Sequence, residues 1–426
     1  MNKDLSLLKG VSVYFTEETL RSVVAKEKNV DPKVVEILGW DFGRANAKGD
    51  SHLSVVQRVK IKSKVNDNET EMSYIVKSFP QNIGRKKTFR SEEFFYNEIT
   101  FYNEVATKFE EYLKSKGQSQ LMLIPRCYAS LLDGDNDYIV LQDVSVDGFG
   151  PLVRQASLTY EQCKSAAETL ARFHAISFGF KRERKEEFEE MVSKLMETFY
   201  REDLYEKWYK RFFESTLVRI ARDSLAKEYP GSRGEKVFNS YQPIDFFKKS
   251  TELCCSRAHE PTSVIGQGDA WAPNFLAREA HPGKFELLLL DFQLARCCSP
   301  VLDIVFFIYS CTDKTMRDQH YEDLLKNYYD ELIMSMKLLD IPDAESVYPW
   351  DLFRKEVKEQ SVYGLTFSLE AVPFTMMPEE EAFDLDQIKE KEIDLVELFT
   401  LPNIKLSENR KRHADMILHA VENGYI

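Results

Sequence analysis

The segment from residue 264 to 295, VIGQGDAWAPNFLAREAHPGKFELLLLDFQLA, constrains the fold more than any other part of the chain. The pair Pro282-Gly283 lies between the apolar runs NFLA and FELLLL, which predicts a β-hairpin that turns at this pair. Facing residues of such a hairpin have numbers that add to 565, as 282 and 283 do, so Asn274 is expected to face Asp291 or a residue one or two positions from it. The loop that enters the hairpin puts Asp269 at the same open end.

Three oxygen-bearing side chains therefore meet at one end of the predicted hairpin. Hard cations such as Mg²⁺ bind carboxylate and amide oxygens and leave room for phosphates. Phosphoryl transfer uses one aspartate to orient the attacking hydroxyl, and an asparagine and a second aspartate to hold the metal. The spacing D-x-x-x-x-N, followed by a strand that ends in Asp-Phe, predicts this use for Asp269, Asn274 and Asp291. The simpler alternative is that the first two only form turns and Asp291 caps the hairpin.

The first 142 residues predict a small antiparallel sheet with one helix. The runs LSVVQRVKIK (53–62) and MSYIVKSF (72–79) are rich in β-branched residues and are separated by the polar VNDNET, which predicts a hairpin. Two more strands are expected on either side of the turn DGDND, within 121–144. The helix is expected to begin near Ser91, a good N-cap, and to continue through EEFFYNEITFYNEVATKFEEYLKS.

The pattern becomes helical from about residue 157. Thr159 and Gln162 have capping-box spacing at the start of one such helix, and residues 182–260 and 314–426 read as amphipathic helices interrupted by prolines. The length of 426 residues suggests two lobes around a large core. We therefore predict an α+β protein with an N-terminal lobe at 1–142 and a mostly helical lobe at 143–426 that carries the hairpin.

A lysine and a glutamate in the N-terminal lobe are expected to pair. Lys77 ends the apolar run YIV on a predicted strand, and Glu98 lies on the apolar stripe of the later helix. An unpaired buried carboxylate costs several kcal/mol, so a cationic partner is needed, and Lys77 is the natural one. The alternative is that Lys77 is a solvent-facing residue at a strand end.

The expected nucleotide contacts rest on weaker patterns. The stretch FGRANAKGDSHLS precedes a strand, and its Gly49 and Ser51 could contribute backbone N–H and hydroxyl groups to phosphates, although it is no GxxxxGK[ST] loop. The stretch YIVLQDV is expected to connect the two lobes. The backbone of Gln142 and Val144 would then be available to an adenine ring.

The composition excludes some classes of partner. A net charge of −13 argues against nucleic acid or an anionic membrane surface, because both need a concentrated basic patch. No apolar run has the length of a signal peptide core or a membrane span, so we expect a cytoplasmic protein. Seven cysteines without CxxC spacing favour free thiols, with zinc at the pairs 254–255 and 297–298 as the alternative.

In the order of its motifs the chain resembles the insect ecdysteroid kinase-like family, relatives of choline kinases and aminoglycoside phosphotransferases with a protein-kinase-like fold. The motifs follow the family's order and cover nearly the whole chain: KGDSHLSVVQRV, YIVKSFP, NEITFYNEV, YIVLQDVSVDGF, LARFHAISF, QGDAWAPNF and LLDFQLARCCSPVLDIVFF. The resemblance implies that Asp269 is the catalytic base and that Asn274 and Asp291 bind magnesium. It also implies that Lys77 binds phosphate with Glu98 as its partner, and that Asp303 braces the catalytic loop.

Two residues near these motifs need separate interpretation. The family commonly has His-Gly-Asp where this chain has Gln267-Gly268-Asp269, and glutamine offers both a donor and an acceptor in place of the histidine. His174 lies on an apolar helix face and is expected to be a hydrogen-bonded core residue.

The expected activity is ATP- and Mg²⁺-dependent phosphorylation of a small hydroxylated acceptor. The resemblance implies a steroid such as an ecdysteroid, or another lipophile. A choline- or aminoglycoside-type acceptor remains an alternative, since a quaternary ammonium needs aromatic and acidic neighbours and the acidic composition permits them. A catalytically silent ligand-binding pseudokinase is the other alternative, with Gln267 as its support.

Overall fold

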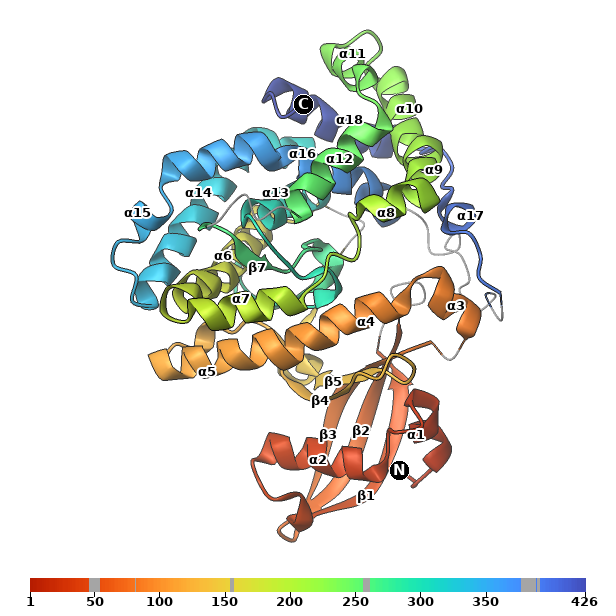
Figure 1. The fold of residues 1–426 in the computed structure, drawn as a ribbon, viewed down its shortest axis with the longest axis vertical. Coiled ribbons are helices and arrows are strands. Elements are labelled where there is room, and N and C mark those ends of the chain that lie inside the picture. The colour runs from red at the N-terminus through yellow and green to blue at the C-terminus, as the bar shows by residue number, and fades with distance from the viewer. Residues whose placement is uncertain (46–53, 81, 154–156, 256–260, 377–387, 389–390) are drawn as a thin grey trace. The chain divides into compact units, whose positions relative to one another are not determined.

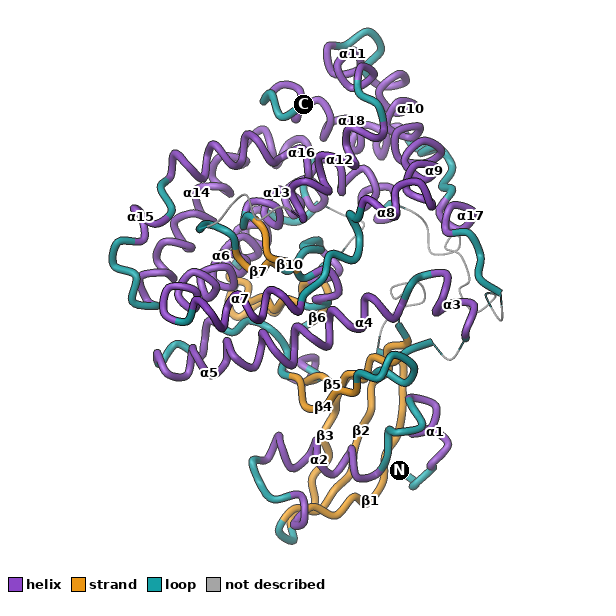
Figure 2. Tube along the Cα trace, viewed as in Figure 1, coloured by secondary structure: helices purple, strands orange, loops and turns teal. Residues whose placement is uncertain are grey.

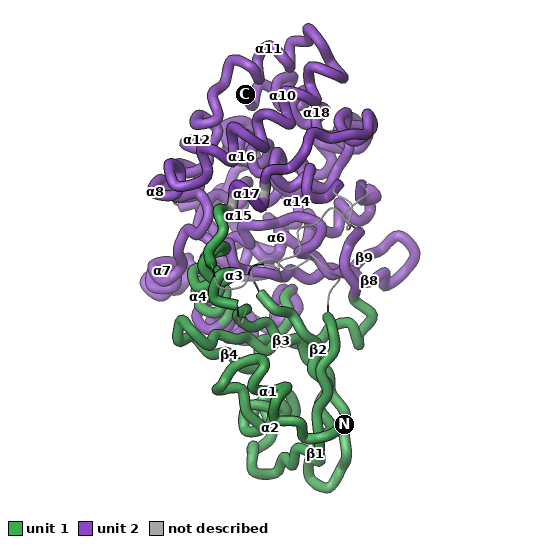
Figure 3. Tube along the Cα trace, turned by 90° about the vertical axis from the view of Figure 1, so that its right-hand side faces the viewer, with its two compact units in different colours: residues 1–102, 124–149, 378–395 green, residues 103–123, 150–377, 396–426 purple. Residues whose placement is uncertain are grey.

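The computed structural model describes residues 1–45, 54–80, 82–153, 157–255, 261–376, 388 and 391–426. The chain divides into two compact units (Figure 3). Unit 1 consists of 1–102, 124–149 and 378–395, and unit 2 consists of 103–123, 150–377 and 396–426. The division into an N-terminal lobe at 1–142 and a C-terminal lobe at 143–426 stays a prediction.

A five-stranded antiparallel sheet forms the centre of unit 1 (Figure 1), which confirms the predicted antiparallel sheet. Its strand order is β1-β2-β3-β5-β4. The sequence analysis did not assign β1, whose two glycines weaken the strand pattern. The strands are β1 (Val35–Arg44), β2 (Val55–Val65), β3 (Asn68–Ser78), β4 (Cys127–Leu131) and β5 (Tyr138–Gln142).

The hairpin predicted across VNDNET is formed by β2 and β3, and it turns through two residues. Val65 pairs with Asn68, and Asn66 and Asp67 between them have φ of 48° and 71°. Two successive positive φ values are the signature of a type I′ turn, which matches the twist of the strands it joins. Alternation along β3 then puts Tyr74 and Val76 on one face of the sheet and Lys77 on the other.

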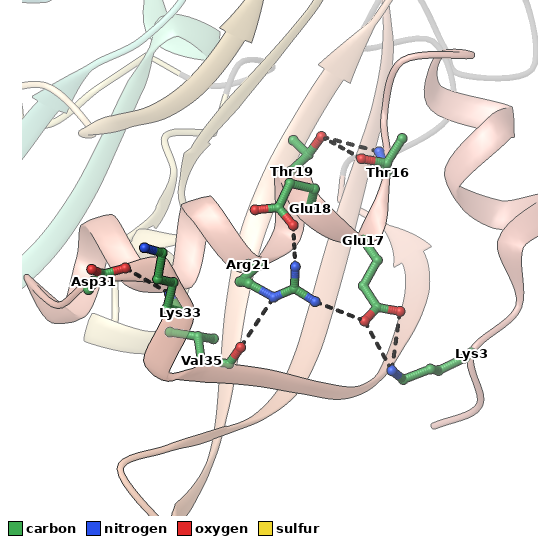
Figure 4. Close-up of polar contacts among 9 residues, drawn as sticks. All are labelled: Lys3, Thr16, Glu17, Glu18, Thr19, Arg21, Asp31, Lys33 and Val35. Atoms are coloured by element: carbon green, nitrogen blue, oxygen red, sulfur yellow. Dashed lines mark hydrogen bonds and ion pairs between the residues drawn. The ribbon is translucent and has the colours of Figure 1, made fainter.

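Two N-terminal helices, α1 (Leu5–Val11) and α2 (Glu17–Lys28), pack against the face that carries Tyr74 and Val76. The helices and the segment between them bury an apolar set against this face: Leu8, Val11, Phe15, Leu20, Val23 and Val24. Polar contacts fix their ends (Figure 4): Arg21 Nε donates to the carbonyl of Val35, and Lys3 Nζ donates to Glu17 at 3.1 Å. The sequence analysis did not assign these two helices.

The predicted helix after Ser91 is confirmed. It consists of α4 (Ser91–Thr100), a π-helical turn (Phe101–Ala106) and α5 (Thr107–Lys116), and a short α3 (Ile83–Thr88) precedes it. Gly117 ends α5 in a left-handed conformation, as C-terminal glycines commonly do.

Most of unit 2 is helical (Figure 2). Two π-helical turns, at Tyr205–Tyr209 and Phe213–Val218, continue the short helices α8 and α9 into α10. The helices after α5 are α6 (Tyr160–Glu183), α7 (Lys185–Lys194), α8 (Glu202–Leu204), α9 (Lys210–Phe212), α10 (Arg219–Glu228), α11 (Arg233–Ser240), α12 (Pro243–Cys255), α13 (Val301–Cys311), α14 (Lys314–Leu338), α15 (Ala344–Val347), α16 (Trp350–Thr375), α17 (Leu395–Phe399) and α18 (Ser407–Glu422).

Helix α13 is the core of this unit, because every one of its residues is buried. A helix that is apolar all round must be covered on all sides. Helix α16 approaches it closely at Gly364, where a Cβ would lie 2.6 Å from the carbonyl carbon of Val305. No helix among the described residues is both long and apolar enough to cross a membrane. All seven cysteines are free.

The predicted hairpin of unit 2 is formed by β8 (Phe275–His281) and β9 (Lys284–Leu289), with Pro282-Gly283 at the turn. The expected pairing sum of 565 holds only for His281 with Lys284. A bulge between Glu279 and His281 shifts the rest by one residue, so that Phe275 pairs with Leu289. Asn274 therefore faces Leu290, and the N–H of Leu290 donates to the carbonyl of Asn274 at 2.9 Å. The expected partner Asp291 is thus wrong by one residue.

Two further short strands complete the setting of this hairpin. Strand β6 (Gly150–Pro151) pairs with β8, and β7 (Val264–Gly266) pairs with β10 (Arg296–Cys298). The β7–β10 pair brings the loop after residue 266 next to the chain that follows Asp291.

A buried histidine on α18 should make folding sensitive to acid. Burial lowers the pKa of His413 from 6.5 to about 4. Between these values the unfolded chain binds a proton that the folded chain rejects, so the free energy of unfolding falls as the pH falls. We expect His413 to account for about 2 kcal/mol of the loss between pH 7 and pH 5.

Chemical denaturation at both pH values measures this loss. The variant His413→Leu should show a smaller decrease than the wild type. The control His281→Gln changes an exposed residue of the β8–β9 turn and should keep the wild-type decrease. Equal decreases in wild type and His413→Leu would contradict the assignment.

Candidate functional site

The loop Gln267-Gly268-Asp269 is held by one buried carboxylate of α13. Asp303 accepts hydrogen bonds from the N–H of Gln267 at 2.7 Å and of Gly268 at 2.9 Å. Asp303 lies inside the first turn of α13, whose N-cap is Pro300, so it is not a helix cap. The bracing role that the resemblance implied for Asp303 is thus present in the contacts.

The same carboxylate is held from behind by His174. The Nε2 atom of His174 lies 3.1 Å from Asp303 Oδ2, and its Nδ1 lies 2.7 Å from the hydroxyl of Tyr328. His174 has no exposed surface. It is therefore a hydrogen-bonded core histidine, as the sequence predicted.

Gln267 links the two chain segments of the site. Its Nε2 donates to the carbonyls of Leu290 at 2.7 Å and Asp291 at 2.8 Å, and its Oε1 accepts from the N–H of Asp269 at 2.7 Å. Both the donor and the acceptor of the amide are thus used. Asp291 has φ of 58° and ψ of 75°, a backbone conformation that is costly for residues other than glycine. The two carbonyls bonded by Gln267 lie on either side of the Asp291 Cα, so Gln267 supports this conformation.

Asn274 and Asp269 are in direct contact. Asn274 Nδ2 donates to the Asp269 carbonyl at 2.9 Å and to its carboxylate at 2.8 Å. The Asn274 amide is oriented by these bonds, because its nitrogen is committed to Asp269 and its oxygen points elsewhere. The three predicted residues Asp269, Asn274 and Asp291 thus come together at the open end of the hairpin.

Asp269 has a strongly perturbed electrostatic environment, which makes it a candidate functional carboxylate. Burial raises the pKa of Asp269 well above its usual value, and the negative charge of Asp291 raises it further. The hydrogen bond from Asn274 and the positive charge of Arg296 act in the opposite direction on the pKa. Two nearby carboxylates of like charge are stabilised when a cation binds between them or when they share a proton.

The donor set fits a magnesium ion in its chemistry. Asp291 offers carboxylate oxygens and Asn274 offers an amide oxygen, and both are hard ligands of the type that Mg²⁺ prefers. Within the described residues, no group of three or more histidine, cysteine, aspartate or glutamate side chains could hold a metal ion. A magnesium ion at these two residues would thus need phosphate oxygens or water to complete its coordination.

A buried arginine behind the loop was not found from the sequence. Arg296 lies within 2.7 Å of Glu197 and donates to the Tyr363 hydroxyl at 2.8 Å. That hydroxyl donates in turn to the carbonyl of Gly268 at 3.4 Å. Arg296 is only 4% exposed, and a charged residue within the apolar context QLARCC was the signal that could have identified it.

The predicted pair Lys77 and Glu98 is formed within unit 1. Lys77 Nζ lies 2.8 Å and 2.7 Å from the two carboxylate oxygens of Glu98. Glu98 has no exposed surface and Lys77 is 7% exposed. The alternative of a solvent-facing Lys77 is wrong.

The expected adenine contacts also lie in unit 1. The N–H of Gln142 donates to the Arg126 carbonyl at 2.8 Å and is therefore committed within the protein. The intervening Asp143, 2% exposed, accepts from Arg58 Nε at 2.7 Å and from the Ser73 hydroxyl at 2.6 Å, which fixes the chain before Val144. Gly49 and Ser51 lie outside the described residues. The roles of all four residues stay predictions.

Gly268 is the residue of the loop that tolerates substitution least. Its φ is 84°, and a Cβ would lie 1.9 Å from the Leu294 carbonyl oxygen, which is backbone and cannot rotate away. We expect Gly268→Ala to lower the free energy of unfolding by at least about 2 kcal/mol. Thermal and urea denaturation would measure this loss. The control Gly150→Ala, whose Cβ meets no atom within 4 Å, should stay near wild type.

The Lys77–Glu98 pair should show strong coupling. Removal of one partner leaves an uncompensated buried charge, so Lys77→Met or Glu98→Gln alone should cost about 3–5 kcal/mol of unfolding free energy. The double variant should cost less than the sum of the two, because no charge is left unpaired. A double-mutant cycle by urea denaturation tests this, and additive losses would contradict a functional ion pair.

Comparisons with known proteins identify the family of this chain. Similar solved structures include the ethanolamine kinase Pv091845 of Plasmodium vivax, with a TM-score of 0.39, 14% identity and coverage of 90% of each chain. They also include the GDP complex of wild-type aminoglycoside 2'-phosphotransferase-IIIa, with a TM-score of 0.34, 13% identity and coverage of 82% of this chain and 95% of that one. No curated protein matches the sequence significantly. The model of the ecdysteroid kinase-like family matches residues 48–341, more than half of the chain, and the protein belongs to that family.

Proposed function

We propose that this protein is an ATP- and Mg²⁺-dependent kinase that transfers the γ-phosphoryl group to a hydroxyl of a small lipophilic acceptor such as an ecdysteroid. Membership in the ecdysteroid kinase-like family supports a phosphotransferase that acts on a small molecule. The observation that carries the proposal is the contact of Asn274 with the carboxylate of Asp269, on a loop braced by Asp303.

In the proposed reaction Asp269 is the base. The acceptor hydroxyl gives its proton to the Asp269 carboxylate while its oxygen forms a bond to the γ-phosphorus, and the bond from that phosphorus to the bridging oxygen of ADP breaks. The bond from Asn274 orients the Asp269 carboxylate. The contacts from Asp303 and Gln267 keep its backbone in place, so little reorganisation is needed when the acceptor binds.

The remaining residues would act on the nucleotide. The oxygens of Asp291 and Asn274 would hold Mg²⁺, which supplies positive charge to the phosphates when bound. Lys77, held by Glu98, would contact phosphate oxygens, and the backbone near Gln142 and Val144 would lie along the adenine. Gly49 and Ser51 would add N–H and hydroxyl donors.

The glutamine at position 267 was the support for the pseudokinase alternative, and its contacts no longer favour that alternative. Gln267 makes three hydrogen bonds that brace both Asp269 and Asp291. Glutamine therefore provides the bracing contacts for which the family commonly uses histidine at this position. An active enzyme is accordingly the better proposal.

The first test compares ATP consumption by the wild type and Asp269→Asn, with Mg²⁺, on a panel of ecdysteroids, choline and other hydroxylated lipophiles. We expect at least one acceptor to be phosphorylated, and the rate to fall about 10²–10⁴-fold in the variant, because general base catalysis contributes about that much. The control Asp351→Asn changes an exposed aspartate and should keep the wild-type rate.

Two outcomes would contradict the proposal. Equal turnover in wild type and Asp269→Asn would remove Asp269 as the base. Silence of the wild type across the panel, together with a thermal shift by Mg-ATP, would instead favour the ligand-binding pseudokinase.

A further inference from the structure

The peptide group between Gly268 and Asp269 is held at both of its polar atoms. Its N–H, which belongs to Asp269, donates to Gln267 Oε1 at 2.7 Å. Its carbonyl oxygen, which belongs to Gly268, accepts from the hydroxyl of Tyr363 on α16 at 3.4 Å. A peptide group is planar, so two bonds on opposite edges fix its rotation. The direction in which the Asp269 side chain leaves the loop is set together with this peptide.

Gly268 is the point at which this peptide could rotate most easily. Its φ is 84°, and glycine has more accessible backbone conformations than any other residue. The bond from the Gly268 N–H to Asp303, at 2.9 Å, lies on the preceding peptide group and does not hold the following one. The bond from Tyr363 therefore restrains a rotation that the bracing by α13 leaves open.

The hydroxyl of Tyr363 is oriented by Arg296. Arg296 Nη1 donates to this hydroxyl at 2.8 Å and also lies 3.1 Å from Cys254 Sγ. A guanidinium group has no acceptor, so the hydroxyl accepts from Arg296 and its own proton is left for the carbonyl of Gly268. The pairing of Arg296 with Gly266 in the β7–β10 ladder places the arginine beside the start of the loop.

Glu197 anchors Arg296 in turn. Arg296 Nε lies 2.7 Å from Glu197 Oε2, and Glu197 Oε1 accepts from the N–H of Phe199 at 2.8 Å and of Tyr200 at 2.7 Å. A buried ion pair that served only the fold would be complete with these contacts. Arg296 instead extends its second nitrogen to Tyr363, which is 1% exposed and contacts the loop.

We propose that Tyr363 is a positioning residue for the reaction, because its hydroxyl, oriented by Arg296, prevents rotation of the peptide between Gly268 and Asp269. Asp269 then presents its carboxylate to the acceptor hydroxyl in a single direction. Helix α16 thereby contributes to the reaction through the loop, without a contact to either substrate. This assignment rests on the proposed kinase function and adds a second helix, besides α13, that holds the base in place.

The test uses two substitutions and a matched control. Tyr363→Phe removes the hydroxyl and keeps the ring. Tyr329→Phe on α14 is the control, because that hydroxyl also donates to a backbone carbonyl, of Tyr348 at 2.8 Å. Arg296→Lys keeps a positive charge but has one nitrogen in place of Nε and Nη1. We measure kcat and KM for acceptor and ATP in these and in the double variant, and hydrogen exchange of the loop by mass spectrometry without substrates.

We expect Tyr363→Phe to lower kcat about 10- to 100-fold with both KM values near wild type, because a misplaced base affects the reaction step more than binding. The loop amides should exchange faster in this variant. Tyr329→Phe should keep the wild-type kcat and the wild-type exchange of the loop. The double variant should be no slower than Arg296→Lys alone, because both substitutions act through the same hydroxyl.

With an active wild type, the assignment is rejected if Tyr363→Phe keeps the wild-type kcat, or if its loop exchanges no faster than that of Tyr329→Phe. A rise in KM without a fall in kcat would also reject it, because the hydroxyl would then serve binding. If the wild type phosphorylates no acceptor, the proposed activity on this panel fails, and hydrogen exchange alone decides. Faster exchange of the loop in Tyr363→Phe would then support the restraint by Tyr363, and equal exchange would reject it.

Discussion

The carboxylate of Asp303 is the interaction on which the rest of the site depends. It accepts two successive backbone N–H groups, from Gln267 and Gly268, and contacts His174. Backbone N–H groups that enter a tight loop need acceptors when they are buried, and a carboxylate is the strongest one available. Asp303 can serve because α13 is buried over its whole length and is held by α16, so the acceptor is in place before any ligand binds.

The buried charges of this chain are of two kinds: some are paired with an opposite charge, and others lie near charges of the same sign. Lys77 with Glu98 and Arg296 with Glu197 are paired at 2.7 Å, so their desolvation is offset within the protein. The pKa of Asp269 is instead raised by its burial and by the negative charge of Asp291. Acidic groups that gather in a buried site are unfavourable for folding alone. A site that binds a cation, a phosphoryl group with its metal, or a donor group of an acceptor gains from the same arrangement.

Much of the local structure, and the grouping of the candidate site residues, could be predicted from the sequence. The hairpin across VNDNET, the helix after Ser91 and the Pro282-Gly283 hairpin follow from short-range patterns, and they appear in the structure. The Lys77–Glu98 pair could be predicted because a buried carboxylate demands a cation. The register of β8 with β9 was off by one residue, because a bulge is set by packing against neighbours rather than by the turn.

The sequence by itself determined which residues had to be together: two aspartates and an asparagine around one hairpin, and a lysine with a glutamate. Only the tertiary structure decided which residues from distant parts of the chain surround them. Arg296 is 67 residues from its partner Tyr363, and Tyr363 is 95 residues from Gly268, whose carbonyl it contacts. No local periodicity reports such contacts, because helix packing between α13 and α16 sets them. Short-range patterns describe how a segment folds, whereas the free energy of a charge depends on every group that folding brings around it.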